Sequence, residues 1–398
     1  WKQRTGCGPR KQRPEFRLFM KLVYLHIPKS AGTSQRLVLS DIYGRDGVFW
    51  YGKNADPQEE FSADTISEYP VVGGHKPISH YPETLDAVYL SVVREPIDRV
   101  ISYYSYLVKP ELAESPGRGV EARQRQAEVW LEKGMCENSI LRSLDHCTDF
   151  RVEVTNWQCR YVSRGRGDFD SALETLRHSK SLIGTMENIE LFNRSLARLM
   201  SWPLVPKRSL NRSRPGSHGL LMEDGLEAVL KELLVEDQKL YQYISSECSG
   251  LLNTIPLNFE RPPELTSCMT LEEQRKSIKV QVYGKGFVGI RESGAGGAGV
   301  ILYNNSNLHV DPKIFPEMGL YADVLDDAGR RLLSEGMFQP VCVAIPPGEK
   351  ILYTFQLQIS PEISCRAKSV SIRFSLVNED RDESFGSLLG ASLAVVYV

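Results

Sequence analysis

The chain has 398 residues, a length that allows two domains of ordinary size, each burying its own hydrophobic core. Lys and Arg total 48 against 50 Asp and Glu, so the formal net charge of −2 offers no general attraction for nucleic acid or an anionic lipid surface. No apolar run approaches the roughly 20 residues that a transmembrane helix needs, and the eight cysteines form no C-x-x-C pair, so neither a membrane span nor a metal site is expected.

The first residues differ in composition from the segment that follows them. Residues 1–19 are polar and basic, and Met20 stands directly before the first apolar run. We expect residues 1–19 to be a disordered basic extension or a segment foreign to the natural product, and we see neither a signal peptide nor an anchor in them.

An apolar, β-prone run at residues 22–27 stops at a proline and is followed by small residues and a new helical pattern from residue 35. This order predicts strand, tight loop and helix. A helix N-terminus with accessible amides binds anions, and a lysine in the loop adds a positive charge. The spacing differs from the nucleoside triphosphate loop, because the lysine precedes the only glycine. The candidate anion-binding residues are Lys29, Ser30, Ala31, Gly32, Thr33 and Ser34; an ordinary strand–helix turn is the alternative.

A polar region at residues 44–69 is expected to be irregular. It precedes a short apolar run that ends in two glycines, Gly73 and Gly74, and then His75. Because glycines leave a strand end uncovered, we expect the backbone there to approach a ligand closely. His75 would stand at the carboxyl edge of the sheet, where ligands bind in open α/β folds. A hydrogen-bonded loop histidine is the alternative.

The continuous apolar run at residues 87–93 predicts a strand buried on both faces, as in a parallel sheet. Pro96 suits the first turn of the next helix, which places Arg94 at the strand's carboxyl end and Ser102 about two turns into the helix. A guanidinium and a hydroxyl make a second phosphate site. Alternatively, Arg94 pairs with Asp98 or Glu95.

The two motifs H-I-P-K-S-A-G-T-S and V-V-R-E-P-I-D-R-V-I-S-Y-Y together resemble the cofactor motifs of sulfotransferases that use 3′-phosphoadenosine 5′-phosphosulfate (PAPS). The pattern is similar to that of the heparan sulfate 2-O-sulfotransferases and their bacterial counterparts. The resemblance implies that Lys29 and residues 30–34 hold the 5′-phosphosulfate, that Arg94 and Ser102 hold the 3′-phosphate, and that His75 is the catalytic base.

Weaker matches follow. Residues 155–161 resemble a substrate-facing insertion, in which Gln158 and Arg160 would bind an acidic sugar; a buried helix with one paired Arg is the alternative. Asn211 and Ser213 lie where relatives close a loop over the cofactor. Apolar spacing predicts one helix over residues 224–246.

A Pro-rich linker is expected at residues 256–270, and residues 271–398 change from helical to strand patterns. Turn residues separate the runs 278–283, 299–303, 341–345, 351–357 and 369–374, which favours a β-sandwich. In its turn sequences, this part resembles the polysaccharide-binding β-sandwich of bacterial O-antigen exporter ATPases; the residues that carry the resemblance are 303–306, 326–329, 346–348 and 376–380. A structural or oligomerising module is the alternative.

These features predict an α/β domain over residues 20–255, with a parallel sheet, a P-loop-like phosphosulfate loop and flanking helices, followed by the all-β sandwich. The resemblance implies in-line sulfuryl transfer from PAPS to a hydroxyl, without a metal, leaving 3′-phosphoadenosine 5′-phosphate (PAP). We expect a polysaccharide or glycan acceptor. The alternatives are a small lipid or phenolic acceptor, a nucleotide kinase, and a non-catalytic glycan-binding protein. We expect a bacterial-type cytoplasmic location, or the Golgi lumen if a natural anchor precedes the chain, no nucleic-acid partner, and a chain able to form a homo-oligomer.

Overall fold

The computed structural model describes residues 21–51, 63–109, 120–205, 221–255, 278–283, 287–290, 295–305, 319–326, 328, 330, 337–341, 345–346, 348–358, 371–377 and 391–397. They divide into two compact units. The α/β unit is drawn from Phe19–Leu196 and Lys207–Glu260, and the β-rich unit from Ala197–Pro206 and Arg261–Val398.

The α/β unit is built on a six-stranded sheet in the order β2-β3-β1-β4-β5-β6. All neighbouring strands run parallel except β6, which pairs antiparallel with β5 at the edge. The predicted α/β class with a mainly parallel sheet is therefore confirmed. The strands are β1 (Lys21–Leu25), β2 (Val48–Tyr51), β3 (Val71–Gly74), β4 (Ala87–Val93), β5 (Lys180–Thr185) and β6 (Leu251–Asn253).

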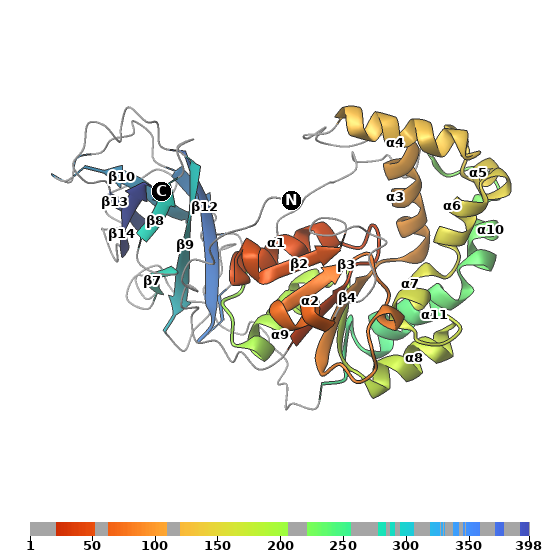
Figure 1. Cartoon of the computed structure of the whole chain (residues 1–398), viewed down its shortest axis with the longest axis horizontal. Helices are drawn as coiled ribbons and strands as arrows, with labels where there is room; N and C mark the ends of the chain where they lie inside the picture. Colours follow the sequence, from red (N-terminus) through yellow and green to blue (C-terminus); the bar gives the residue numbers. More distant parts are fainter. Residues whose placement is uncertain are drawn as a thin grey trace, which may run out of the picture. The chain divides into compact units, whose positions relative to one another are not determined.

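Helices surround this sheet (Figure 1). Figure 1 shows α3 to α6 and α10 as one group, and these helices share a hydrophobic cluster of their own. The helices are α1 (Gly32–Tyr43), α2 (Ala63–Glu68), α3 (Pro96–Val108), α4 (Val120–Glu132), α5 (Ile140–His146), α6 (Thr148–Val154), α7 (Trp157–Val162), α8 (Phe169–His178), α9 (Ile189–Met200), α10 (Leu226–Leu233) and α11 (Val235–Gln242), with short turns η1 (Arg45–Gly47), η2 (Ile78–His80) and η5 (Tyr243–Glu247).

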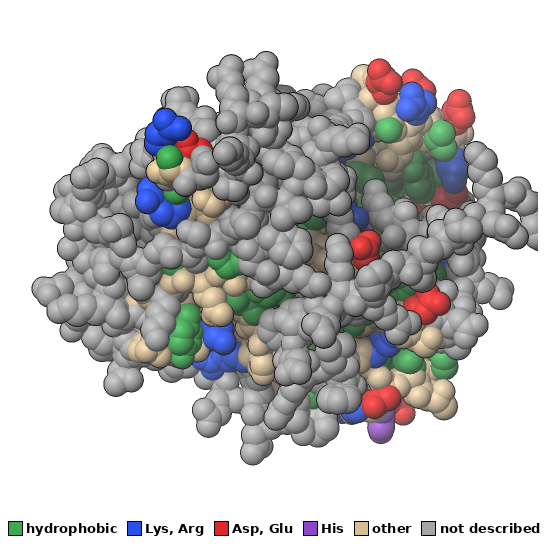
Figure 2. All heavy atoms as spheres, turned by 60° about the vertical axis from the view of Figure 1, so that its left-hand side comes forward, with side chains coloured by type: hydrophobic (Ala, Val, Ile, Leu, Met, Phe, Trp, Pro, Cys, Tyr) green, Lys and Arg blue, Asp and Glu red, His purple; other side chains and the backbone are tan. Residues whose placement is uncertain are grey.

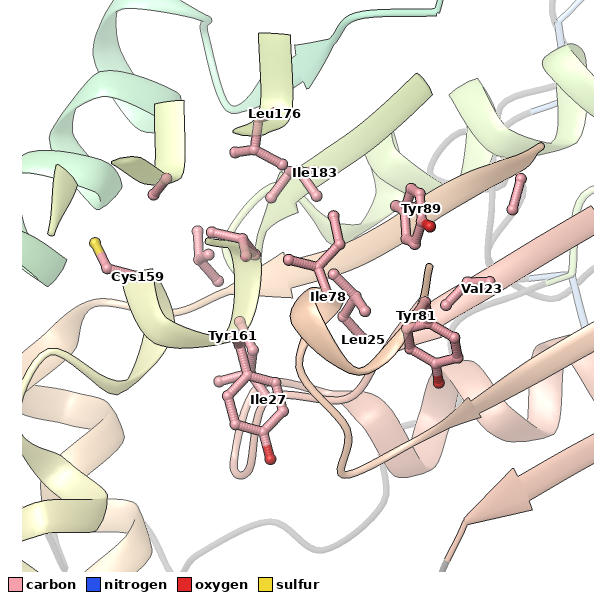
Figure 3. Close-up of a cluster of buried hydrophobic side chains, with 14 of the residues drawn as sticks. Val23, Leu25, Ile27, Ile78, Tyr81, Tyr89, Cys159, Tyr161, Leu176 and Ile183 are labelled. Atoms are coloured by element: carbon pink, nitrogen blue, oxygen red, sulfur yellow. The ribbon is translucent and has the colours of Figure 1, made fainter. Parts of the chain in front are cut away.

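The main core lies between one face of the sheet and helices α7, α8 and α11 (Figure 3). Leu25 of β1 and Ile183 of β5 are fully buried there, together with Leu176 of α8. Across the sheet, Gln35 of α1 donates a hydrogen bond to Asn193 of α9 at 2.9 Å. Strands covered on both faces account for the continuous apolar runs in the sequence.

The central strands place three loops side by side. β3, β1 and β4 are consecutive neighbours and run in the same direction. The loops that leave their carboxyl ends carry His75, Lys29 and Arg94, so these three residues lie at one edge of the sheet, as ligand-binding residues do in open α/β folds.

Two local expectations for the α/β unit were wrong. The region at residues 44–69 contains a buried strand, β2, within the part expected to be irregular. The space beside the glycines of β3 is filled by that strand: a Cβ on Gly73 would lie 2.5 Å from the Trp50 ring, and one on Gly74 would lie 2.7 Å from the Tyr51 carbonyl oxygen. The glycines therefore make room for β2 rather than for a ligand.

The single helix expected over residues 224–246 is also divided. α10 ends and α11 begins around Leu234, whose φ of −112° and ψ of 17° interrupt the helix. The break leaves the first amides of α11 free to bind elsewhere, and the side chain of Asn156 accepts from Glu236 and Asp237 at 3.0 and 3.3 Å. The continuous apolar stripe gave no sign of this interruption.

The β-rich unit contains two sheets, in the orders β11-β10-β13-β14-β8 and β12-β9-β7. Their pairings are antiparallel except between β14 and β8, which are parallel. The predicted change from helices to strands is confirmed, although residues 342–344 of the run expected at 341–345 lie outside the described residues. The strands are β7 (Ile278–Tyr283), β8 (Phe287–Ile290), β9 (Ala295–Asn304), β10 (Gly319–Leu325), β11 (Met337–Pro340), β12 (Lys350–Gln358), β13 (Ser371–Val377) and β14 (Ala391–Tyr397).

The described charged side chains that appear in Figure 2 carry both signs, in keeping with the balanced composition. Among the helices of the described ranges, none combines the length and the low polarity that a membrane crossing requires.

Candidate active site

The loop between β1 and α1 has a backbone geometry suited to an anion, and we call residues 29–34 the anion cradle. Lys29 and Ala31 adopt left-handed conformations, with φ of 70° and 58°. Ala31 caps α1 without a side-chain hydrogen bond, and the amide of Gln35 is bound to the Ala31 carbonyl at 3.1 Å. The preceding amides, those of residues 32–34, have no intrahelical acceptor, because a helix cannot satisfy its first turn. This loop geometry concentrates N–H donors at the helix N-terminus, where a phosphate or sulfate is favoured.

Ser30 adds a hydroxyl to the cradle. Its side chain is 1% exposed, and its Oγ has no hydrogen-bond partner among the described residues. A buried hydroxyl without a partner is costly, so its position beside the amides fits a bound oxyanion that would accept its proton. The donor set of the loop is therefore compatible with the phosphosulfate group of PAPS.

Lys29 brings a positive charge to the same loop. Its ammonium group lies 4.4 Å from the centroid of the Tyr106 ring, a cation–π contact with α3. Arg94 donates a long hydrogen bond of 3.4 Å from Nη1 to the Lys29 carbonyl. Burial, followed by the positive charges of Arg123 and Arg94, lowers the pKa of Lys29 to about 8. A bound anion would relieve this repulsion and favour the protonated lysine.

Two residues near the cradle were missed by sequence reasoning. Tyr106, with 37% of its surface exposed, lies under Lys29, and the guanidinium of Arg123 on α4 is 5.6 Å from the same ring. Arg123 belongs to a polar helix in which an arginine reads as part of a solvated face. Only the packing of α4 beside α3 brings its charge to Lys29.

His75 follows β3 and is an exposed residue, although the Nδ1 side of its ring is partly buried. Its Nδ1 lies 3.1 Å from the carbonyl oxygen of His26. Because a carbonyl only accepts, Nδ1 carries the hydrogen, and the lone pair of the neutral ring is on Nε2. Desolvation by the surrounding atoms lowers the pKa of His75 below its ordinary value of 6.5, and the bond to the His26 carbonyl offsets part of this effect. This shift favours the neutral ring, which is the form that can accept a proton.

Arg94 and Ser102 occupy the positions expected of them. Arg94 directly follows β4 and is partly exposed, and Ser102 is buried in α3 at 5% exposure. Burial lowers the pKa of Arg94, whereas the charges of Asp98, Glu187 and Glu95 oppose this shift. Glu95 itself caps α3, because its carboxylate accepts from the Asp98 amide at 2.6 Å.

Gln158 has a role other than the predicted contact with an acceptor. Its side chain is fully buried in α7. Its Oε1 accepts from the Arg94 amide and its Nε2 donates to the Arg94 carbonyl, both at 2.9 Å. The oxygen and the nitrogen of the Gln158 amide are thus both hydrogen-bonded to the backbone of Arg94. Gln158 therefore positions Arg94, and the Gln158 side chain is not available to a sugar.

The remaining predicted residues are less informative. Arg160 is exposed and donates to the Val152 carbonyl at 3.4 Å. Asn211 and Ser213 lie outside the described residues. Within the described part of the chain, no group of three or more His, Cys, Asp or Glu residues is placed to hold a metal ion.

Comparison with solved structures gives short, distant matches. The CARDB domain of a Pyrococcus furiosus protein is 13% identical, with 31% of this chain and 94% of that chain covered and a TM-score of 0.20. Red sea bream transglutaminase is 17% identical over 31% of this chain and 15% of its own, also with a TM-score of 0.20. A β-glucosidase from Listeria innocua is 12% identical over 30% and 16%, with a TM-score of 0.18. Similarity at this level carries no argument about fold or function.

No curated protein matches the chain. The model of the sulfotransferase family, however, matches residues 19–137, a segment that contains the cradle, His75, Arg94 and Ser102. The resemblance found in the sequence motifs is thereby confirmed at the level of the family: residues 19–137 are similar to the sulfotransferase family.

Proposed function

We propose that the chain transfers the sulfuryl group of PAPS to a hydroxyl group of a glycan, with His75 as general base and Lys29 as the cation that stabilises the departing phosphate. Residues 30–34 would hold the 5′-phosphosulfate, whereas Arg94 and Ser102 would hold the 3′-phosphate, with Asn211 and Ser213 as further candidates.

PAPS supplies the activated sulfuryl group. The neutral His75 ring takes the proton of the acceptor hydroxyl at Nε2 while the hydroxyl oxygen forms a bond to sulfur. The bond between sulfur and the phosphate oxygen breaks, and its electron pair stays with the phosphate of PAP. Lys29 and the loop amides stabilise the charge that develops there. No further oxidant or reductant enters the step.

One observation carries the proposal: the His26 ring contacts both Gly32 of the anion cradle and the ring of His75. A Cβ on Gly32 of the cradle would lie 1.7 Å from the His26 ring, and the His26 and His75 rings are stacked with centroids 4.1 Å apart. The anion site and the candidate base are thus close neighbours through His26, which supports a reaction that needs both groups at one acceptor hydroxyl.

The choice of a glycan rests on resemblance. The motifs are similar to those of polysaccharide sulfotransferases, and the β-rich unit resembles a polysaccharide-binding β-sandwich of O-antigen exporter ATPases. Small lipid and phenolic acceptors fit the same cradle and base. A nucleotide kinase would use the cradle as well, although the position of Lys29 before the glycine differs from that of nucleotide loops.

The experiment is to incubate the full chain with labelled PAPS and a panel of desulfated polysaccharides, glycolipids and small phenols. We expect label in a polysaccharide or glycolipid and release of PAP. Transfer to small phenols alone would refute the glycan acceptor, and magnesium-dependent hydrolysis or transfer from ATP without use of PAPS would refute the sulfotransferase.

Two variants sharpen this experiment. His75→Ala should abolish transfer yet leave the affinity for PAP nearly unchanged, because His75 acts on the acceptor. Lys29→Met should weaken PAP binding and transfer together. His178→Ala is a matched control, since this exposed histidine lies at the end of α8 and its Nδ1 contacts the Glu174 carbonyl.

A further inference from the structure

His26 joins the strand ends on which the proposed site is built. It follows β1, and its amide donates to the Gly74 carbonyl at 3.0 Å. Its own carbonyl is the oxygen that fixes Nδ1 of His75 at 3.1 Å. The backbone of this residue therefore connects the end of β1 to the end of β3, directly before His75.

The side chain of His26 is a packing element between the cradle and the base. It is 9% exposed, and its ring is stacked on that of His75 at an interplanar angle of 26°. Trp50 of β2 lies beside it, at 5.7 Å between ring centroids. On the side of α1, a methyl group at Gly32 would overlap the ring, at 1.7 Å from Cδ2 and 2.0 Å from Nε2. The ring thus fills the space between Gly32 and His75.

A purely apolar residue would fill that space at lower cost. Nδ1 of His26 is buried and has no hydrogen-bond partner among the described residues, which is unfavourable for a polar atom. Burial, and then electrostatic repulsion from His75 in its protonated form and from Arg36 and Lys29, lowers the pKa of His26 well below its ordinary value. The neutral, flat ring of His26 can stack on His75 both when His75 is neutral and when it has accepted a proton and become an imidazolium. This is a reason for an imidazole, instead of an apolar side chain, at position 26.

We infer that His26 is a positioning residue: its ring holds the His75 imidazole against the Gly32 end of the anion cradle, so that base and cofactor loop keep one relative orientation. The inference rests on the proposed function for its kinetic consequence, but the orientation of His75 is a property of the protein without substrates.

The direct test compares His26→Ala and Gly32→Ala with their double variant. We expect His26→Ala to lower kcat at least tenfold and to change the KM for PAPS less than threefold, because the cradle amides belong to the backbone of α1. Gly32→Ala should also lower kcat, since its methyl group displaces the ring. The double variant should be no worse than His26→Ala, because the methyl group then enters vacated space; such non-additivity indicates direct contact.

A rescue experiment separates packing from acid–base chemistry. Added pyrazole resembles the missing ring but is too weakly basic to act as the general base, and small rings do enter cavities left by truncated side chains. We expect pyrazole to restore activity to His26→Ala and not to His75→Ala. The inference would be overturned if the losses of kcat in His26→Ala and Gly32→Ala added up in their double variant. Equal rescue of His26→Ala and His75→Ala by pyrazole would also overturn it.

Nitrogen-15 NMR of His75 keeps this test independent of turnover. In the native chain we expect the tautomer with hydrogen on Nδ1, and in Gly32→Ala a shifted or averaged signal, even if His26→Ala does not fold. An unchanged His75 signal in both variants would overturn the inference. A native chain that transfers no sulfate, yet shows these signals and their change, would refute the proposed function and leave the positioning role supported.

Discussion

Lys29 illustrates how a single residue acquires its chemistry from its surroundings. In the sequence it is a lysine in a small loop, with an ordinary pKa near 10.5. In the structure its half-buried side chain places the ammonium group over the Tyr106 ring, near the positive charges of Arg123 and Arg94. The protein thus holds a cation that a bound anion would stabilise, and ligand binding is coupled to protonation.

This coupling gives a pH prediction for the anion site. Because the pKa of Lys29 is about 8 in the ligand-free protein and rises when an anion binds, PAP affinity should be constant below that pH and fall as the pH rises through it. Calorimetry in buffers of different ionisation enthalpy should show proton uptake on binding around pH 8. Lys29→Met should bind PAP weakly and lose the uptake, whereas Arg123→Ala should move the affinity loss to higher pH.

His75 gives a second pH prediction, of opposite sign. The base acts when neutral, and its pKa lies below 6.5. The rate constant kcat/KM should therefore increase as the pH rises through that pKa, with the midpoint of this increase below pH 6.5. The pH–rate profile at saturating PAPS measures this directly. An acidic limb centred above pH 7 would assign the base to another group.

At the scale of elements, the packing of α7 against α11 supports the backbone of Arg94. The amides of Gln158 and Cys159, at the start of α7, donate to the buried Asp237 carboxylate of α11 at 3.1 and 2.8 Å. Arg99 of α3 is buried nearby, and its charge counteracts the rise in the pKa of Asp237 that burial causes. Through Gln158, this helix packing reaches the backbone of Arg94.

We predict that Gln158→Leu weakens PAP binding although Gln158 does not touch the proposed ligand. The change leaves the Arg94 amide and carbonyl without their partners, at a cost of about 1–3 kcal/mol for each buried group left unsatisfied. Part of this cost should appear as lower thermal stability, and part as roughly tenfold weaker PAP binding. Gln158→Glu keeps the acceptor for the Arg94 amide and should have the smaller effect; equal PAP affinity in all three proteins would contradict the positioning role.

At the scale of the whole molecule, the chain combines an α/β unit that carries the proposed chemistry with a β-rich unit of two sheets. A net charge of −2 supplies no general attraction for an acidic polymer, so an acidic glycan must be bound by local features. The basic residues around the cradle are one such feature, and the proposed polysaccharide-binding role of the β-rich unit would be a second.

This division predicts that acceptor binding survives loss of catalysis. If the β-rich unit supplies most of the affinity, the full chain with Lys29→Met and His75→Ala should bind the acceptor polysaccharide with a Kd within about threefold of the native value, because these residues lie in the other unit. Binding of fluorescent polysaccharide, followed by anisotropy, measures this. A loss of affinity parallel to the loss of transfer would place acceptor binding at the catalytic site.

The sequence alone determined the strand–loop–helix segments around Lys29 and Arg94 and the strand before His75, because each depends on local apolar periodicity, proline and glycine. It also indicated the residue types of an anion site and a base. It could not show which side chains from distant segments meet, such as Arg123 beside Lys29 and Gln158 hydrogen-bonded to Arg94. It also could not show that strand β2 fills the space beside Gly73.

The tertiary structure decided these contacts for a physical reason. Parallel strands β3, β1 and β4 bring their carboxyl ends together only through pairings between segments far apart in the chain. Local periodicity can mark a side chain as buried, but it cannot identify what it is buried against. That limit explains why His26 reads as an ordinary strand-end residue in the sequence, whereas in the fold its ring lies between Gly32 and His75.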